Sequence, residues 1–332
     1  MNASESLSND GAESPRGAVS RRRFLQGAAA CGLLAPLASA TGCEPAGPGF
    51  GRLDKVWGRH GVVGGRMHKA RAMAIDADQR LYLVDFTARI LVYDLDGNYL
   101  HGWSTPVCDN GRPTGLTYDP ASNRLLVADT HYYRILEYEL DGSLVSAATT
   151  GGTNGVAPGE FGFVTDAVRD SQGCLYVCEY GDNDRVQKFS PDGEFLAQWG
   201  SHGTGPDQFK RPQNLLVDSD DRLWVCDACN HRIKVFDPDG KLVAMWGEEG
   251  SAPGQMYYPY DIVMDPAGDL YIVEYGNHRV QKFTQGGESL GVWGGQGRDE
   301  GQLWDPWALA LDSHNRLHVL DTHNNRVQRV VV

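Results

Sequence analysis

Three oxygen-bearing side chains recur at equivalent places in neighbouring stretches of the chain and could hold a metal ion. Asp166, Asn214 and Asp261 each stand near the start of an apolar stretch, 48 and 47 residues apart. Carboxylate and amide oxygens are the ligands that Ca²⁺ prefers. If the fold brings these stretches together around one centre, the three residues form a candidate cation site.

Acidic and arginine residues form a second, more regular pattern. Each Arg follows an acid by four to six residues, and the arginines recur 45 to 51 residues apart. Because six copies stand at equivalent positions and a buried, unpaired charge is costly, we interpret the pairs as structural and not as an active site. The acids are Asp85, Asp129, Glu179, Asp227, Glu274 and Asp321, and the arginines are Arg89, Arg134, Arg185, Arg232, Arg279 and Arg326.

The cysteines do not indicate a zinc site. Cys226 and Cys229 have a Cys-x-x-Cys spacing, but a four-thiolate site needs a second such pair. Cys178 and Cys226 occupy the same repeat position, where other copies have Val, Ala or Leu, so we expect them in the core. Cys108, Cys174 and Cys229 could form disulfides in an oxidising compartment, and the sequence leaves that question open.

Short β-strands in six similar units must position all these residues. Each unit has an apolar strand, a second strand that ends in the acid, a third that opens with the Arg, and a fourth. An Asp-Gly turn precedes the fourth strand in several units, where Gly supplies the positive φ of a hairpin. Four alternating strands per unit, with no window of long-helix spacing, predict an all-β, six-bladed β-propeller with four-stranded antiparallel blades.

The first and last strands of the pattern complement each other. The sixth unit stops after its third strand at Val332, and residues 53–57 resemble the missing fourth strand. An N-terminal strand that completes the last blade closes the ring and removes an exposed sheet edge. We therefore predict a propeller over residues 53–332, after a linker over residues 43–52.

The repeat resembles the NHL repeat, whose name-giving letters stand here as Asn230-His231 and Asn277-His278. The resemblance extends over residues 53–332. It implies a six-bladed propeller in which these two histidines support loops. Propellers host many unrelated activities, so the resemblance implies the fold and no particular function.

The positions that differ between blades indicate where a ligand would bind. Two adjacent positions at the start of the innermost strands vary, and they lie at the mouth of the central channel. Since adjacent strand residues point to opposite faces, we expect only one of the two sets to line the channel. One set contains the candidate metal ligands. The other offers a cation, hydrogen-bonding groups and two aromatic rings for a ligand: Arg71, Thr114, Thr165, Gln213, Tyr260 and Trp307.

Three functions stay open at this point. We expect a non-catalytic scaffold that binds a protein, peptide, carbohydrate or other small molecule at the channel mouth. One alternative is a metal-dependent hydrolase or lyase with Ca²⁺ or Zn²⁺ at the mouth, similar to gluconolactonase-like propellers or peptide α-amidating lyases. Those families place their metal ligands one residue after the Pro, where this chain has no His. The other alternative is an accessory subunit of an exported redox enzyme.

Residues 1–42 resemble a twin-arginine export signal. The sequence Ser-Arg-Arg-Arg-Phe-Leu-Gln at residues 20–26 precedes a short apolar run rich in Ala and Gly. Two cleavage sites stay open: after Ala40, or before Cys43, where residues 40–43 resemble a lipobox. We expect an exported, extracytoplasmic protein in the periplasm, which a lipid on Cys43 would anchor to the membrane.

The charge excludes one class of partner. The formal net charge is −13, and an acidic surface repels the phosphates of nucleic acids. We expect a monomer that binds no nucleic acid.

Overall fold

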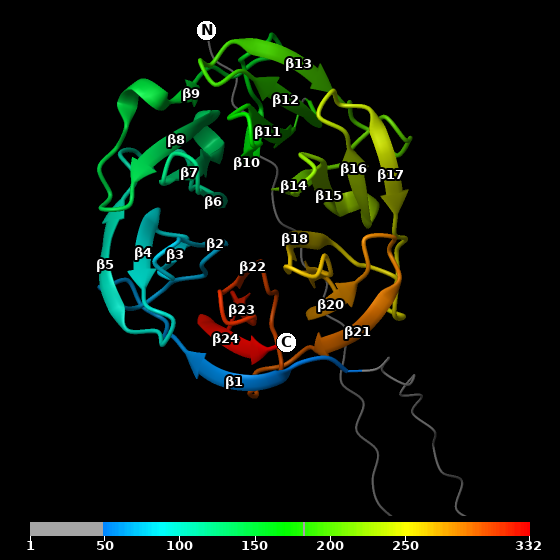
Figure 1. The fold of residues 1–332 in the computed structure, drawn as a ribbon. Helices are drawn as coiled ribbons and strands as arrows, with labels where there is room; N and C mark the ends of the chain where they lie inside the picture. Colours follow the sequence, from blue (N-terminus) through cyan, green and yellow to red (C-terminus); the bar gives the residue numbers. More distant parts are fainter. Residues whose placement is uncertain (1–48, 182) are drawn as a thin grey trace, which may run out of the picture. The chain divides into compact units, whose positions relative to one another are not determined.

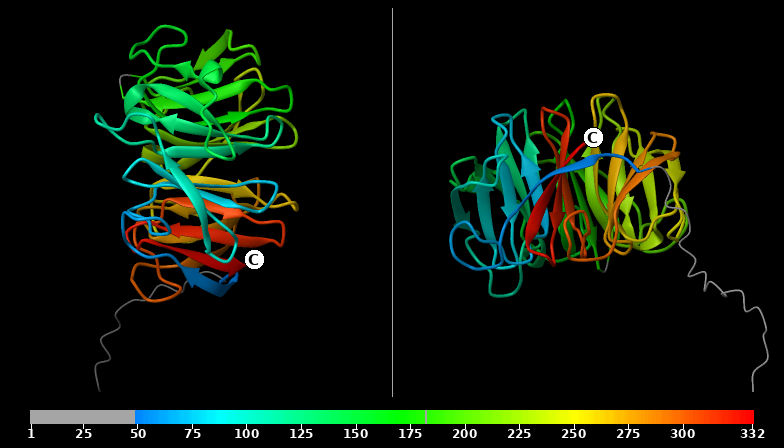
Figure 2. Two further views of the ribbon diagram at one scale, coloured as in Figure 1. Left: turned by 90° about the vertical axis from the view of Figure 1, so that its left-hand side faces the viewer. Right: turned by 90° about the horizontal axis from the view of Figure 1, so that it is seen from below.

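Six four-stranded antiparallel sheets surround a central channel in the computed structural model of the protein, which describes residues 49–181 and 183–332 (Figure 1). The predicted six-bladed propeller is thus confirmed. The side views show the sheets standing next to one another around the ring (Figure 2). The predicted export signal and Cys43 lie outside the described residues.

Each of the first five blades is one continuous run of four strands, counted from the channel outward. Blade 1 contains β2 (Ala72–Ile75), β3 (Leu81–Val84), β4 (Arg89–Tyr93) and β5 (Tyr99–Ser104). Blade 2 contains β6 (Gly115–Asp119), β7 (Arg124–Asp129), β8 (Arg134–Glu139) and β9 (Thr150–Gly151). Blade 3 contains β10 (Phe163–Arg169), β11 (Leu175–Tyr180), β12 (Arg185–Phe189) and β13 (Phe195–Trp199). Blade 4 contains β14 (Pro212–Val217), β15 (Leu223–Asp227), β16 (Arg232–Phe236) and β17 (Leu242–Trp246). Blade 5 contains β18 (Pro259–Met264), β19 (Leu270–Glu274), β20 (Arg279–Phe283) and β21 (Ser289–Gly294).

Helical structure in the described residues is limited to three short 3₁₀ turns, all in loops: η1 (Thr130–Tyr132), η2 (Ser146–Ala148) and η3 (Ala228–Asn230). Within the part of the chain that the structure describes, no helix has the length and apolar character needed to cross a membrane.

Blade 6 combines strands from distant parts of the chain. Its inner strands are β22 (Ala308–Leu311), β23 (Arg316–Asp321) and β24 (Arg326–Val331), and β1 (Arg52–Trp57) adds the fourth strand, antiparallel to β24. The predicted closure of the ring by an N-terminal strand is therefore confirmed. A bridge between Gly49 and Val292 of blade 5 extends the contact beyond β1.

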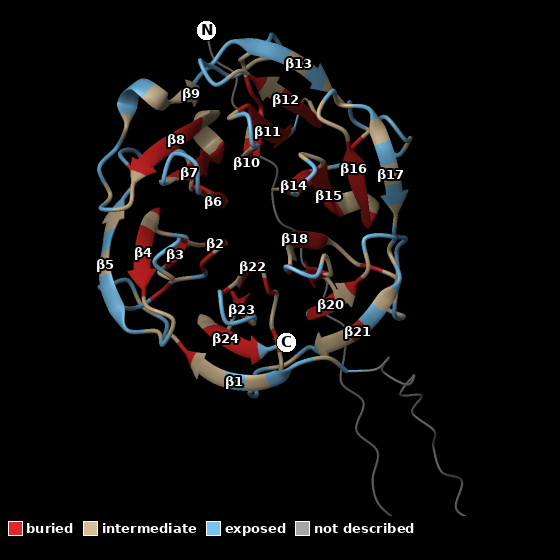
Figure 3. Ribbon diagram, in the orientation of Figure 1, coloured by how far each residue is buried: buried red, intermediate tan, exposed pale blue. Residues whose placement is uncertain are grey.

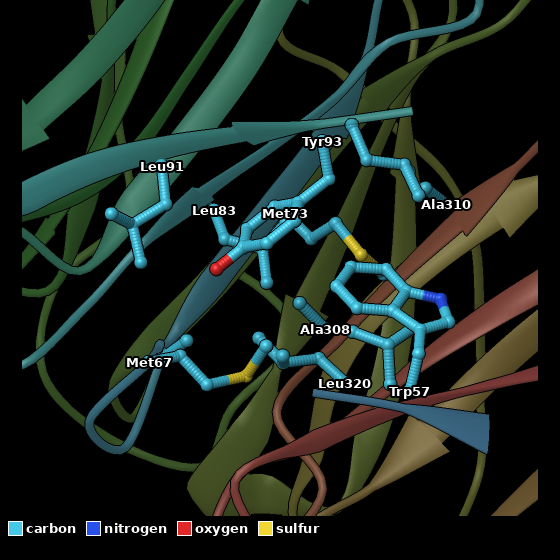
Figure 4. Close-up of a cluster of buried hydrophobic side chains, with 12 residues drawn as sticks. Trp57, Met67, Met73, Leu83, Leu91, Tyr93, Ala308, Ala310 and Leu320 are labelled. Carbon is cyan, nitrogen blue, oxygen red and sulfur yellow. The ribbon is translucent and has the colours of Figure 1, made fainter. Parts of the chain in front are cut away.

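Buried apolar side chains fill the spaces between neighbouring blades, whereas the outer strands are largely exposed (Figure 3). The cluster between the last and first blades joins Trp57 and Leu320 of blade 6 to Met73 and Tyr93 of blade 1 (Figure 4). Burial of one large apolar side chain contributes about 1.5–3 kcal/mol. Side-chain burial therefore holds the closure together in addition to strand pairing.

The closing tryptophan of one blade packs on the turn glycine of the next. Gly240 adopts a φ of +82°, and a Cβ added there would lie 2.6 Å from the ring of Trp199. Blade 2 lacks a closing Trp, and a Cβ on the turn glycine that follows it, Gly193, would meet nothing within 4 Å. The same contact joins three further pairs: Gly97 with Trp57, Gly142 with Trp103, and Gly287 with Trp246.

The repeated acids and arginines are structural, as the sequence indicated. In blade 4, Arg232 Nε donates to the buried Asp227 Oδ2 at 2.7 Å. The remaining N–H groups of Arg232 donate to backbone carbonyls of Thr204, Gly205 and Gln208, in the loop that leads into the blade. All six pairs form, with N–O distances of 2.5 to 2.8 Å.

Candidate ligand site at the channel mouth

Both variable sets of residues line the channel mouth, where the innermost strands begin. Together they surround a cavity of about 20 Å³, with residues 71 and 72 from blade 1 and the corresponding pairs from the other five blades. The expectation that only one set lines the channel is wrong. The sheets are radial, so each innermost strand turns an edge to the channel and side chains from both of its faces flank the opening.

Asp166, Asn214 and Asp261 bridge neighbouring blades. Asp166 Oδ2 accepts the backbone N–H of Leu215 at 3.1 Å and the side-chain amide of Asn214 at 3.0 Å. Asp261 Oδ2 accepts the backbone N–H of Leu309 at 2.8 Å, and Asn214 makes the corresponding contact to blade 5 at 3.4 Å. Each side chain therefore satisfies an N–H on an inner strand edge, which buried backbone requires.

The two carboxyl groups of this trio are buried, and burial raises the pKa of both. The pKa of Asp166 rises to about 7, although the Leu215 N–H and the Thr117 hydroxyl act to lower it. The pKa of Asp261 rises well above its ordinary value because of burial, and the charge of Asp166 adds to the increase. Both groups therefore hold a proton more tightly than a carboxyl in water does.

The described residues form no metal site built from acids, cysteines and histidines alone. Within residues 49–181 and 183–332, no group of three or more His, Cys, Asp or Glu side chains is placed to hold a metal ion. In the trio, an amide stands between two carboxyls, and oxygens of all three accept backbone N–H groups. Ca²⁺ or Zn²⁺ binding by Asp166, Asn214 and Asp261 stays a prediction.

Two arginines and three aromatic rings form what we call the mouth cluster: Arg71, Arg211, Tyr260, Tyr275 and Trp307. The rings of Tyr260 and Tyr275 stack with centroids 4.7 Å apart, and Trp307 meets Tyr260 edge-on at 4.9 Å. The Arg71 guanidinium lies 5.2 Å from the Trp307 ring, and that of Arg211 lies 5.9 Å from the Tyr260 ring. All six predicted ligand residues line the mouth cavity, and three of them, Arg71, Tyr260 and Trp307, belong to this cluster.

Each of the two arginines lies over one further ring. Arg71 lies 4.6 Å from the ring of Phe86, and Arg211 lies 5.0 Å from the ring of Tyr180. A guanidinium over an aromatic face gains about 0.5–2 kcal/mol. The cation–π contacts hold both guanidinium groups at the mouth without a carboxylate.

Among the described residues, neither arginine of the mouth cluster has an acidic partner. No ion pair and no side-chain hydrogen bond joins Arg71 or Arg211 to residues 49–181 or 183–332, and Arg211 Nε is buried without an acceptor. Burial lowers the pKa of Arg71, and the nearby charge of Arg211 lowers it further. The two cations therefore lie within range of each other's charge.

The other predicted ligand residues are more deeply set. Thr165 donates its hydroxyl to the carbonyl of Pro212 at 2.7 Å, and the hydroxyls of Thr114 and Thr130 bond at 2.7 Å. Gln213 is 4% exposed, and its Oε1 has no hydrogen-bond partner in the described part of the chain. Gln213 thus remains free to bond a ligand, whereas the two threonines hold the structure.

Four residues of the mouth were not identified from the sequence. Phe86, Tyr180 and Tyr275 directly follow the strand-ending acids of blades 1, 3 and 5, and Arg211 directly precedes Pro212. The residue after the strand-ending acid alternates around the ring: it is aromatic in blades 1, 3 and 5, and it is Thr, Ala and Thr in blades 2, 4 and 6. This alternation is the signal that could have identified the three aromatic residues.

A larger cavity lies at the opposite end of the innermost strands. It has a volume of about 380 Å³ and is lined mainly by apolar side chains, including Met73, Leu116, Leu216 and Ile262. Arg169, at its edge, pairs with Asp119 at 3.1 Å and also with Glu137. This cavity was not predicted from the sequence.

The cysteines and repeat histidines have the predicted structural roles. Cys178 and Cys226 are fully buried in the core, and all five cysteines among the described residues are free thiols. His231 Nδ1 accepts the backbone N–H of Tyr258 at 3.1 Å, and His278 Nδ1 accepts that of Asp305 at 3.0 Å. Both histidines therefore support the loop that enters the next blade.

Comparison with known proteins agrees with the repeat pattern. The NHL repeat model matches residues 209–236 and 256–283, so the chain carries NHL repeats in blades 4 and 5. Human NHL repeat-containing protein 3 is 30% identical over 191 residues, which cover 54% of each chain. The chain thus matches only about half the length of this relative.

Rat peptidylglycine alpha-amidating monooxygenase is 41% identical over 69 residues, which cover 19% of this chain and 7% of that protein. A solved structure of streptogramin B lyase shares the fold with a TM-score of 0.58 and 13% identity, covering 80% of this chain and 93% of that one.

Proposed function

We propose that this propeller is a binding scaffold whose ligand site is the mouth cluster. The observation that carries the proposal is a set of stacked aromatic rings and two arginines without an acidic partner among the described residues, at the position where the six blades differ most. Rings and guanidinium groups are the side chains that most often anchor a bound partner. The proposed ligand is a small molecule, a peptide or a protein loop that inserts into the mouth.

The contacts of the trio favour binding over metal-dependent chemistry. Asp166, Asn214 and Asp261 already use side-chain oxygens to hold the backbone of the next blade. The matching part of the amidating monooxygenase is short, and likeness to a propeller lyase at this identity indicates the fold alone. A binding scaffold accounts for the mouth cluster and lets Asp166, Asn214 and Asp261 keep their hydrogen bonds to backbone N–H groups.

Removal of one ring of the mouth cluster tests the proposal. A panel of sugars, short peptides and aromatic acids is screened against the protein by ligand-observed NMR. Binders are then titrated into Trp307→Ala, which should weaken them about tenfold. Phe195→Ala, a matched loss of an exposed ring on the outer strand β13, should leave affinity unchanged. Equal affinity in wild type and Trp307→Ala would place the site elsewhere.

We also propose export by the twin-arginine route, on the sequence of residues 20–26. Replacing Arg21 and Arg22 with Lys should retain the protein in the cytoplasm. Replacing Cys43 with Ala separates the two cleavage sites: release from the membrane fraction supports a lipid anchor, and an unchanged distribution supports cleavage after Ala40.

A further inference from the structure

Arg71 of blade 1 lines the mouth cavity, and Arg211, which precedes the first strand of blade 4, lies over Tyr260 of the same cavity wall. We propose, on the basis of the mouth-binding function above, that the mouth cluster recognises a carboxylate group carried on an aromatic or apolar body. The carboxylate would lie between the two guanidinium groups, and the rest of the ligand would contact the surrounding rings.

The surroundings of the arginines favour an anion. Each guanidinium lies over two rings, Arg71 over Phe86 and Trp307 at 4.6 and 5.2 Å, and Arg211 over Tyr180 and Tyr260 at 5.0 and 5.9 Å. Aromatic rings supply no oxygen acceptor, so the N–H groups of both arginines can still donate to a ligand. The N–H edge of a guanidinium matches the two oxygens of a carboxylate.

The charges of the mouth also favour an anion. In a chain with a net charge of −13, two neighbouring cations stand without a carboxylate from residues 49–181 or 183–332. Asp305, which accepts a hydrogen bond from Tyr275 in the mouth cluster, also pairs with His278 and His323. A bound carboxylate would relieve the repulsion between Arg71 and Arg211.

The cavity at the mouth has room for one oxygen of such a group. Its volume is about 20 Å³, and a site of ~10–15 Å³ holds one water-sized group. A carboxylate can therefore place one oxygen there. Trp307 Nε1 is a buried donor without a partner among the described residues, and Gln213 lies in the same cavity wall. The Trp307 N–H can donate to the entering oxygen, whereas the unpartnered Gln213 Oε1 is an acceptor and cannot bond a carboxylate oxygen.

The body of the ligand follows from the surface around the opening. Phe86 is 38% exposed beside Arg71, and the stacked rings of Tyr260 and Tyr275 lie next to Trp307. Several aromatic rings close together favour a ligand with a planar or apolar body over a strongly hydrated, polar ligand. The structure therefore assigns an aromatic or apolar carboxylic acid, or a chain-terminal carboxylate after an apolar residue.

Benzoate and its neutral analogue benzamide test the inference in the full chain by calorimetric titration at pH 7.5. Benzoate should bind at least about tenfold more tightly than benzamide. Arg71→Gln and Arg211→Gln should each weaken benzoate at least about tenfold and leave benzamide unchanged. Arg298→Gln, which removes an arginine 4.8 Å from the ring of Trp304, is the matched control and should bind benzoate like wild type. Arg71→Lys keeps the positive charge but lacks the planar guanidinium that can bind both carboxylate oxygens, so it should bind benzoate more weakly than wild type. This variant serves as the test if Arg71→Gln does not fold.

Four outcomes would overturn the inference: equal binding of benzoate and benzamide, no effect of either arginine, phosphate or sulfate binding as tightly as benzoate, or no benzoate binding up to about 10 mM. The first two outcomes leave the scaffold proposal standing if Trp307→Ala still weakens binding of the neutral ligand about tenfold. Binding that is insensitive to Trp307 as well as to both arginines would refute the scaffold proposal too.

Discussion

Replacing Lys234 with Gln should stabilise the protein near neutral pH. Lys234 is fully buried, and burial lowers the pKa of its amino group from 10.5 to about 8. Each pKa unit corresponds to ~1.4 kcal/mol, so the folded state disfavours the charged lysine by up to about 3 kcal/mol below pH 8. The equivalent positions of blades 3, 5 and 6 hold Gln187, Gln281 and Gln328, which are also fully buried.

The contacts of those glutamines show what Gln would do in blade 4. Gln281 Nε2 donates to the carbonyl of Gln255 and to Glu274 Oε1, at 2.7 and 2.6 Å. Lys234 makes the first kind of contact, with carbonyls of the entering loop, and its Nζ lies 3.8 Å from Asp227. A Gln at position 234 can keep both interactions without a charge. After allowance for the lost cation–π contact with Phe209, at 4.3 Å, we expect a gain of about 1–3 kcal/mol.

Urea unfolding followed by tryptophan fluorescence measures the effect at pH 6.5, 8 and 10. Because the folded pKa of Lys234 lies below its unfolded value, the unfolded chain binds more protons between pH 8 and 10.5, and wild-type stability should rise with pH across that window. The Lys234→Gln variant should be more stable than wild type at pH 6.5. Its stability should not show the increase between pH 8 and 10.5 that the titration of Lys234 causes in the wild type. Lys234→Met, which removes the hydrogen-bonding group, is the control for the polar contacts. A Lys234→Gln variant less stable than wild type at pH 6.5 would show that the buried charge is favourable and refute the reasoning.

Two further predictions concern the contacts between blades and the three residues Asp166, Asn214 and Asp261. Gly240→Ala should lower the free energy of unfolding by ~1–3 kcal/mol more than Gly193→Ala, because both glycines have φ of +82° to +84° but only the first Cβ would meet a Trp ring. Equal losses in urea unfolding of the two variants would contradict this packing contact. A chelator should leave the melting temperature unchanged, because oxygens of the trio already accept backbone N–H groups. Stoichiometric metal in the purified protein that is lost in Asp261→Ala would instead support the metal site.

The fold could be predicted from the sequence because the pattern of strands and acid–Arg pairs is repeated in six units. One unit alone would be ambiguous between a hairpin and a loose pair of strands, but six acid–Arg pairs in phase identify the second and third strands of every blade. Ring closure was predictable for a related reason, since the incomplete sixth unit and residues 53–57 are complementary.

The candidate site was predicted only in part. Arg71, Tyr260 and Trp307 were identified because they stand at a repeat position where the blades differ. Phe86 and Arg211 were missed because they lie in loops, and a loop side chain reaches the channel only through the three-dimensional course of the backbone. Arg211, for example, adopts a left-handed φ of +55° just before Pro212, a conformation that residue type alone does not reveal.

The pairing of β1 with β24 also has a consequence for the order in which the protein folds. Arg52 pairs with Val331, so the outermost strand of the last blade is synthesised before any other strand of the ring. Five blades are made of neighbouring segments and can form as the chain emerges, whereas β1 has no partner within its sheet until β24 has been added. Contacts between such distant segments are slow to form. The exposed edge of β1 therefore needs protection throughout synthesis, and on the proposed export route, which carries folded proteins, this last step precedes transport.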